Sequence, residues 1–347
     1  MPGDTKADTP RAFLILCLGV VCVALLSSTG PCWADETLAT RLGNLDATVL
    51  AEEPKRAGML ADDVRARRAK ANLRETALWH KIQTRRDWEQ FRDARIHALH
   101  GSLGQFPPVP KELQVRLART LAGDGYRIDN LVFESRPGLF VTANLYRPSD
   151  PRDSMPGILL CHSHHNPKTQ AELQDMGMTW ARLGCIVLVM DQLGHGERRQ
   201  HSFRSRDDYP GEFRVGRQDY HFRYNVGMQL HLIGDSLIGW MVWDLMRGVD
   251  LLLDWAGADP QRIILLGSVA GGGDPVAVTA ALDRRIAAVV PFNFGGPQPE
   301  NRYPLPPDAE RSFNYAGSGS WESTRNLRLS VRDGFMPWVI VGAVAPR

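Results

Sequence analysis

The segment that most constrains the fold is a short apolar run that ends in a dense glycine turn. Residues 262–266 read Arg-Ile-Ile-Leu-Leu, and residues 267–274 continue as Gly-Ser-Val-Ala-Gly-Gly-Gly-Asp. Small, helix-compatible residues follow from Pro275 to Leu282. This order of strand, sharp turn and helix is typical of a nucleophile elbow, in which a serine stands at the carboxyl end of a parallel strand.

The spacing of this turn departs from the elbow pattern Gly-x-Ser-x-Gly. Gly267 and Gly271 bracket Val269, which has no nucleophilic atom, and Ser268 stands one position early. Ser268 is therefore the candidate catalytic residue if the turn is built differently, and a plain turn serine otherwise. Asp274 is a candidate pocket residue, or a cap of the helix that follows.

Apolar, β-rich runs alternate along the chain with helix-forming segments. We predict strands at residues 127–135, 139–146, 157–161, 185–190, 263–266 and 286–290. We predict helices at residues 169–183, 237–255 and 275–282, with a long polar connection at 195–224. Strands of continuous apolar character that alternate with helices indicate an α/β fold with a doubly wound, mostly parallel sheet.

Two segments precede this α/β core. Lys6 and Arg11 stand before an uncharged apolar run at residues 12–26, and a small residue, Ala34, precedes Asp35. This is the order of a secretory signal peptide, so we expect an exported protein, periplasmic or extracellular; the alternative is a membrane anchor formed by an uncleaved leader. The expected organisation is a signal peptide at 1–34, an N-terminal helical extension at 35–125 and the α/β core at 126–347.

The overall charge of the chain is close to neutral. It has 41 Lys and Arg against 39 Asp and Glu, a formal net charge of +2. We therefore expect no nucleic-acid partner, and no stable membrane span once the leader is removed. Cys161 and Cys185 lie at opposite ends of two predicted neighbouring strands, too far apart for a disulfide, so two buried free thiols are expected.

Polar residues follow three of the predicted parallel strands. His162, Ser163 and His164 follow the strand at 157–161. Asp191 and His195 follow the strand at 185–190, and the glycine turn follows the strand at 263–266. Because parallel strands end at one edge of a sheet, and open α/β sheets bind ligands there, these residues are the candidate site.

Together these three segments resemble the α/β-hydrolase superfamily, in particular its exported bacterial acetyl-xylan-esterase-like and dienelactone-hydrolase-like group. The loop Asp191-x-x-Gly194-x-Gly196 is similar to the D-x-x-G-x-G loop of that superfamily. Residues 162–164 stand where such proteins carry an H-G-x oxyanion loop. The resemblance covers about residues 127–347.

The resemblance implies a serine-type carboxylesterase that needs no cofactor and no metal. Its substrate would be a small-molecule ester or, more specifically, an acetylated carbohydrate. Chemistry of this kind uses a serine, a histidine base and an orienting acid. Ser163, His164 and Val269 would line the oxyanion site and pocket, because the backbone N–H donors come from the residue after the nucleophile and from the His162 loop.

The order of residues departs from this pattern, and two other functions stay open. Hydrolases of this fold place the histidine after the serine, whereas the last histidine here is His231. We expect the missing acid and histidine loops beyond Arg347, and hence weak or no activity in the chain as given. The alternatives are a metal-dependent hydrolase that uses the cluster listed next, and a non-catalytic binding protein on a hydrolase fold. The cluster is His162, His164, Asp191 and His195.

Overall fold

A computed structural model describes residues 36–45, 53–163, 167–200, 215–292, 294 and 327–345. The chain divides into two compact units, Met1–Asp63 and Val64–Arg347. The described part of the first unit holds α2 (Glu36–Gly43) and the beginning of α3 (Glu53–Trp79). The expected signal peptide lies outside the described residues, and none of the helices that are described is long and apolar enough to cross a membrane.

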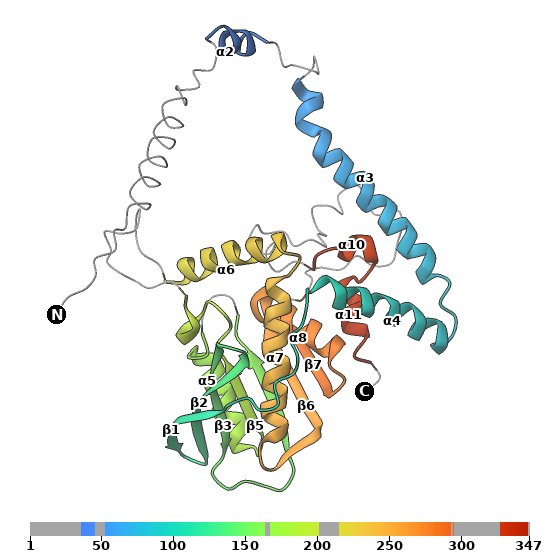
Figure 1. Cartoon of the computed structure of the whole chain (residues 1–347). Helices are drawn as coiled ribbons and strands as arrows, with labels where there is room; N and C mark the ends of the chain where they lie inside the picture. The colour runs from blue at the N-terminus through green and yellow to red at the C-terminus, as the bar shows by residue number, and fades with distance from the viewer. Residues whose placement is uncertain are drawn as a thin grey trace, which may run out of the picture. The chain divides into compact units, whose positions relative to one another are not determined.

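The second unit is organised around a seven-stranded sheet with the order β1-β2-β3-β5-β4-β6-β7 (Figure 1). Its strands are β1 (Arg116–Gly123), β2 (Tyr126–Arg136), β3 (Leu139–Pro148), β4 (Met155–Cys161), β5 (Ile186–Met190), β6 (Ala258–Ser268) and β7 (Ile286–Phe292). The pairs from β1 to β5 are antiparallel, and β5, β4, β6 and β7 run parallel to one another. The sheet is therefore mostly parallel on the side that carries the candidate site.

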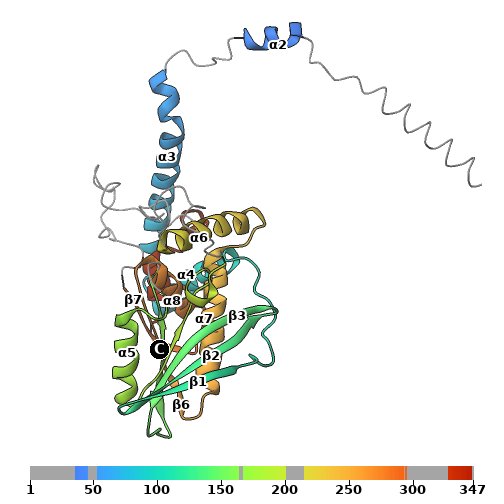
Figure 2. The ribbon, with the colours of Figure 1, turned by 90° about the vertical axis from the view of Figure 1, so that its left-hand side faces the viewer.

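Helices cover both faces of this sheet. The described helices of this unit are α4 (Arg85–Ser102), α5 (Ala171–Arg182), the 3-10 turn η1 (Gly196–Arg198), α6 (Val215–Leu232), α7 (Leu237–Asp254), α8 (Val269–Leu282), α10 (Ser330–Asp333) and α11 (Pro337–Gly342). Helix α5 lies on one side of the sheet and α7 on the other (Figure 2). Helix α8 packs on β6 and β7, on the face that α7 covers.

The two-sided burial explains the continuous apolar strands in the sequence. Side chains alternate between the faces of a strand. In β4, Ile158 and Leu160 belong to the cluster under α5, while Leu159 and Cys161 belong to the cluster under α7 and α8. Burial on both faces leaves no position for a polar residue, and all five residues of β5 are buried.

Most of the predicted elements are confirmed, and so is the α/β-hydrolase-type architecture. The hairpin at 127–135 and 139–146 forms β2 and β3, and the turn between them lies at residues 137–138. The two described cysteines are free thiols, as expected; Cys161 is buried, but Cys185 is only half-buried.

The region expected to be a helical extension differs from the prediction in two places. Strand β1, within residues 35–125, pairs with β2 and belongs to the sheet. The helical stretch also breaks between Trp79 and Arg85, where Thr84 caps α4 by accepting a hydrogen bond from the Asp87 N–H. The chain thus enters the sheet earlier than its sequence pattern indicates.

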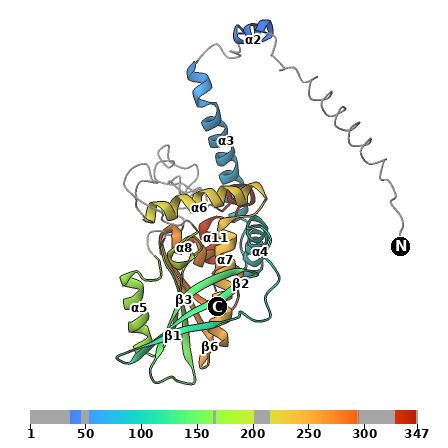
Figure 3. The ribbon, with the colours of Figure 1, turned by 60° about the vertical axis from the view of Figure 1, so that its left-hand side comes forward.

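Two further segments are helical where another structure was expected. The glycine-rich stretch after Ser268 is not a separate turn, because α8 begins at Val269 and runs through Pro275. The predicted connection at 195–224 contains the beginning of α6 from Val215 onward, which lies above the carboxyl ends of the parallel strands (Figure 3). Residues 201–214 of that connection lie outside the described residues.

Candidate active site at the carboxyl ends of the parallel strands

The register of three neighbouring strands brings the candidate residues to one edge of the sheet. Cys161, the last residue of β4, is opposite Met190 of β5 and Gly267 of β6. The next residues along the chain, His162, Asp191 and Ser268, therefore lie at the same level at this edge. The prediction that these three segments meet at one edge is confirmed.

His162 is a buried, neutral histidine with both ring nitrogens in hydrogen bonds. Its Nδ1 lies 2.6 Å from the carbonyl oxygen of Ser163, and its Nε2 lies 2.9 Å from the backbone nitrogen of Gln192. The backbone N–H can only donate, so Nε2 is the acceptor and Nδ1 carries the proton that is donated to Ser163. Burial lowers the pKa of His162 to about 4, so the ring is neutral at pH 7.

Gln192 connects this histidine with three other parts of the site. The two protons of its Nε2 are shared among three acceptors, which are the Sγ of Cys161 (3.1 Å), the carbonyl oxygen of Gly271 (2.8 Å) and the carbonyl oxygen of His162. Its Oε1 accepts a hydrogen bond from Nη2 of Arg223 on α6, at 2.8 Å. Since arginine can only donate, the orientation of the carboxamide is fixed by these partners.

Asp191 is buried and surrounded by donors. Its carboxylate accepts hydrogen bonds from Lys168 Nζ (2.6 Å), the Lys168 backbone N–H (2.9 Å) and Thr142 Oγ1 (2.9 Å). Burial raises the pKa of Asp191, but the Lys168 ammonium and these hydrogen bonds outweigh burial and hold that pKa below its usual value. This carboxylate serves to position the loop, because its oxygens are directed at protein donors.

The glycine pattern of the 191–196 loop follows from this arrangement. Gly196 has a φ of 55°, and a Cβ there would lie 2.3 Å from a carboxylate oxygen of Asp191. Only a residue without a side chain lets the loop fold around the carboxylate. Arg198 then donates from Nη1 to the Asp191 carbonyl oxygen (3.0 Å) and to Asp244 Oδ2 on α7 (2.8 Å).

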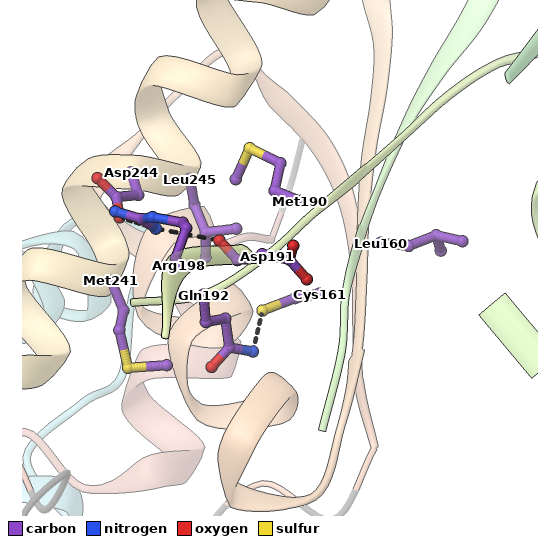
Figure 4. A pocket seen from close by; sticks show the side chains of 9 residues that line it. All are labelled: Leu160, Cys161, Met190, Asp191, Gln192, Arg198, Met241, Asp244 and Leu245. Carbon is purple, nitrogen blue, oxygen red and sulfur yellow. Dashed lines mark hydrogen bonds and ion pairs between the residues drawn. The ribbon is translucent and has the colours of Figure 1, made fainter. Parts of the chain in front are cut away.

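A small enclosed cavity lies behind this loop (Figure 4). Asp191, Gln192 and Arg198 contribute to its polar side, and Asp244 completes the ion pair across it. Figure 4 shows that the carboxamide of Gln192, in the 191–196 loop, is directed at the sulfur of Cys161 at the end of β4. The cavity is interior, so it is part of the support of the site rather than a substrate pocket.

Ser268 lies at the junction of β6 and α8 with its side chain exposed. Its φ of −123° and ψ of 151° are ordinary extended values, whereas a nucleophile elbow is strained. Ser268 is the N-cap residue of α8, yet its side chain makes no capping hydrogen bond. Asp274 is inside α8 and half-buried, so the expectation that it caps this helix is wrong.

Glycines allow the first turns of α8 to lie directly on the ends of two strands. A Cβ at Gly272 would be 2.5 Å from the Cys161 carbonyl oxygen and 3.0 Å from that of His162. A Cβ at Gly273 would be 2.7 Å from the Phe292 carbonyl oxygen at the end of β7. The glycine run that looked like a turn is therefore a site of close backbone approach.

Two of the residues proposed as metal ligands, His162 and Asp191, make hydrogen bonds to protein groups. Within the described ranges, no group of three His, Cys, Asp or Glu is arranged to hold a metal ion. His162 and Asp191 hold the hydrogen bonds given above, and the ring of His195 lies 5.2 Å from that of His162, between centroids. His195 is fully buried, and His164 lies outside the described residues.

Comparison with known proteins identifies the family of the chain. A model of the acetyl xylan esterase (AXE1) family matches residues 111–294, which is more than half of the 347 residues. The chain belongs to the acetyl xylan esterase family. The range of this chain that matches the acetyl xylan esterase model begins just before β1 and ends after β7, so it contains the whole sheet and the candidate site. The resemblance drawn from the sequence is confirmed.

Solved structures are similar to this family member at low sequence identity. The methylesterase BT1017 is 18% identical with a TM-score of 0.54, over 80% of this chain and 54% of that one. A glucuronoyl esterase from Solibacter usitatus is 16% identical with a TM-score of 0.49, over 77% and 74%. Acetyl xylan esterase 1 from Thermoanaerobacterium sp. JW/SL YS485 is 14% identical with a TM-score of 0.42, over 73% and 72%. No curated protein matches the sequence.

Three buried residues of the site were not singled out from the sequence. They are Lys168, Gln192 and Arg223. Their only signal is position, because Gln192 directly follows Asp191 at a strand end and Lys168 lies in the loop after β4. Arg223 sits on α6, in a segment that was expected to be an irregular connection.

Proposed function

We propose that this protein is a carboxylic ester hydrolase that acts on acetylated carbohydrate. The match of residues 111–294 to the acetyl xylan esterase family carries this proposal. It is supported by the meeting of the His162, Asp191 and Ser268 segments at one edge of the parallel sheet, where ligands of open α/β sheets bind. No cofactor or metal is part of the proposed chemistry.

In this proposal Ser268 is the nucleophile. Its exposure at the strand end would let it reach an ester. The backbone N–H of Val269 would stabilise the oxyanion from one side, and the loop of Ser163 and His164 from the other. The acyl group would pass from the sugar oxygen to Ser268 Oγ, and the proton lost by Oγ would end on the released sugar hydroxyl. Water would then take the acyl group as the free acid and return a proton to Oγ.

We expect slow turnover in this chain, because the described site offers no ready base for Ser268. His162 has a pKa of about 4, and its Nε2 already accepts the Gln192 N–H. His195 is fully buried. A neutral hydroxyl without an adjacent base is a weak nucleophile, so activated esters are the appropriate first substrates.

The test is acetate release from 4-nitrophenyl acetate and from acetylated xylooligosaccharides. We expect Ser268→Ala to abolish release, and Ser154→Ala, an exposed serine at the opposite end of β4, to leave it unchanged. Equal release by Ser268→Ala and the wild type would exclude Ser268 as nucleophile, and release that stops with a chelator would point to metal chemistry instead. No release from either ester would overturn the proposed function.

We also propose that the protein is exported after cleavage near Asp35. The observation is the order of Lys6, Arg11, the apolar run at 12–26 and a small residue at Ala34. Expression with its own N-terminus and mass analysis of the exported protein is the test. An intact N-terminus in a membrane fraction would support the anchor instead.

A further inference from the structure

We infer that Gln192 is a positioning residue that holds the two halves of the oxyanion site at a fixed separation. One half is the loop after β4, which begins at His162. The other is the first turn of α8, which begins at Val269 and contains Gly271. This inference rests on the proposed function for its catalytic consequence, but the hydrogen bonds on which it depends can be measured without turnover.

The carboxamide of Gln192 joins these two halves directly. Its Nε2 donates to the carbonyl oxygen of His162 on one side and to that of Gly271, at 2.8 Å, on the other. Both carbonyls belong to backbone segments that would supply oxyanion donors, so one planar group sets the distance between them.

The carboxamide is itself fixed by its surroundings. Gln192 is 7% exposed, and its Oε1 accepts the Arg223 Nη2 hydrogen bond at 2.8 Å. Its backbone N–H donates to His162 Nε2 at 2.9 Å. Since each end of the side chain has a partner of one kind only, the amide cannot flip without two buried mismatches.

The close packing beside Gln192 makes the separation sensitive to this contact. The backbone of Gly272 packs so closely against the Cys161 and His162 carbonyl oxygens that there is no room for a Cβ atom. Without the bridging N–H groups, the carbonyl oxygens of His162 and Gly271 would lose the donor that lies between them. Such groups repel, so α8 is expected to move away from the β4 loop.

The variant Gln192→Glu distinguishes the bridging of the two carbonyl oxygens from the anchoring of Arg223 on α6. Glutamate keeps an oxygen for Arg223, but it cannot donate to the two carbonyls. If Gln192 only anchors Arg223, Gln192→Glu is tolerated. If it spans the oxyanion site, Gln192→Glu fails as badly as Gln192→Met, which loses both functions.

The kinetic experiment measures kcat and KM for 4-nitrophenyl acetate hydrolysis. We expect both variants to lower kcat about 10- to 100-fold with little change in KM. Misplaced donors reduce the stabilisation of the transition state more than they reduce the binding of the ester. The control is Gln174→Glu on α5, whose carboxamide donates to the Thr169 carbonyl oxygen away from the site. Wild-type kcat in Gln192→Glu would overturn the inference.

A second measurement uses the wild-type protein and needs no activity. Both carboxamide protons of Gln192 should exchange slowly with solvent in NMR spectra, while those of Gln174 exchange fast. Rapid exchange at Gln192 would overturn the inference even if the variants fail to fold. Slow exchange together with no ester turnover would overturn the proposed function and leave the bridging role of Gln192 standing.

Discussion

The Nε2 atom of His162 accepts a hydrogen bond from the backbone N–H of Gln192 at 2.9 Å, so this ring is held in its neutral form. On its other side, Nδ1 donates to the Ser163 carbonyl oxygen. Protonation would place a second hydrogen against the Gln192 N–H in a fully buried position. The relationship therefore determines how the protein responds to acid.

We predict that stability falls with pH below about 6.5 because of His162. Burial lowers the folded-state pKa to about 4 from the ordinary 6.5, so the unfolded chain takes up the proton first. The contribution is complete above pH 6.5 and decreases between about 6.5 and 4, by roughly 3 kcal/mol. Urea unfolding of the wild type and of His162→Gln at several pH values isolates this effect. Parallel stability curves for the two proteins between pH 7 and 4.5 would contradict it.

Lys168 is predicted to be essential for stability at neutral pH. Its side chain is 6% exposed and lies 2.6 Å from the fully buried Asp191 carboxylate. Lys168→Met leaves that charge without its cation, which should cost about 3–5 kcal/mol. Without Lys168 the pKa of Asp191 rises, so the loss should shrink as the pH falls toward 4.

The control for Lys168 is an exposed ion pair. Arg85 and Glu89 pair at 2.8 Å with side-chain exposures of 78% and 39%. Arg85→Met should therefore change the free energy of unfolding by less than about 0.5 kcal/mol. Chemical denaturation of both variants at pH 7 and pH 4.5 is the measurement. A Lys168→Met loss as small as the control would show that Asp191 does not depend on Lys168.

The sheet could be predicted because the apolar pattern of each strand reflects which of its faces are buried. Val141, Ala143 and Leu145 alternate along β3 and are all buried. The continuous apolar run of β5 reflects helices on both faces. These patterns depend only on which side of a strand contacts the core, so they are local and can be recognised in a single sequence.

Strand β1 and the beginning of α8 could not be predicted, because neither follows a local rule. The first seven residues of β1 are exposed, so no alternation marks the strand, and pairing with β2 alone holds it in the sheet. Glycines at 271–273 disfavour a helix. They occur there because α8 must approach the carbonyl oxygens of Cys161 and Phe292.

The candidate site was predictable in its backbone and not in its side-chain network. The ends of β4, β5 and β6 follow from strand order. By contrast, Gln192 meets Gly271, which is 79 residues away, and Lys168 meets Asp191, which is 23 residues away. No spacing rule connects such residues, because their contact depends on how three separate segments fold against one another.

Ser236 is predicted to stabilise the beginning of α7 through two hydrogen bonds. Its Oγ accepts from the Gly239 N–H at 3.1 Å and donates to the Leu103 carbonyl oxygen at 2.9 Å, with 1% of the residue exposed. Ser236→Ala removes the cap and leaves a buried carbonyl without this donor, which should cost about 1–2 kcal/mol. Ser149→Ala, at an exposed serine, should cost less than about 0.5 kcal/mol. Thermal and urea unfolding compare them; equal effects would refute the capping role.

Gly272 is predicted to be irreplaceable, although it lies in a helix, where alanine is normally the better residue. A Cβ there would meet the Cys161 carbonyl oxygen at 2.5 Å, and neither backbone can yield without separating α8 from β4. Gly272→Ala should therefore lower the free energy of unfolding by about 1–3 kcal/mol or more, despite the gain in helix propensity.

Gly101 in α4 provides the matched comparison. It is also helical, but nothing lies within 4 Å of its added Cβ. Gly101→Ala should raise the free energy of unfolding by up to about 0.5–1 kcal/mol, because alanine loses less backbone entropy. Urea unfolding of the two variants should thus give shifts of opposite sign. A stabilising Gly272→Ala would mean that the first turn of α8 is not packed on the end of β4. It would also contradict the close contact between the two halves of the proposed oxyanion site.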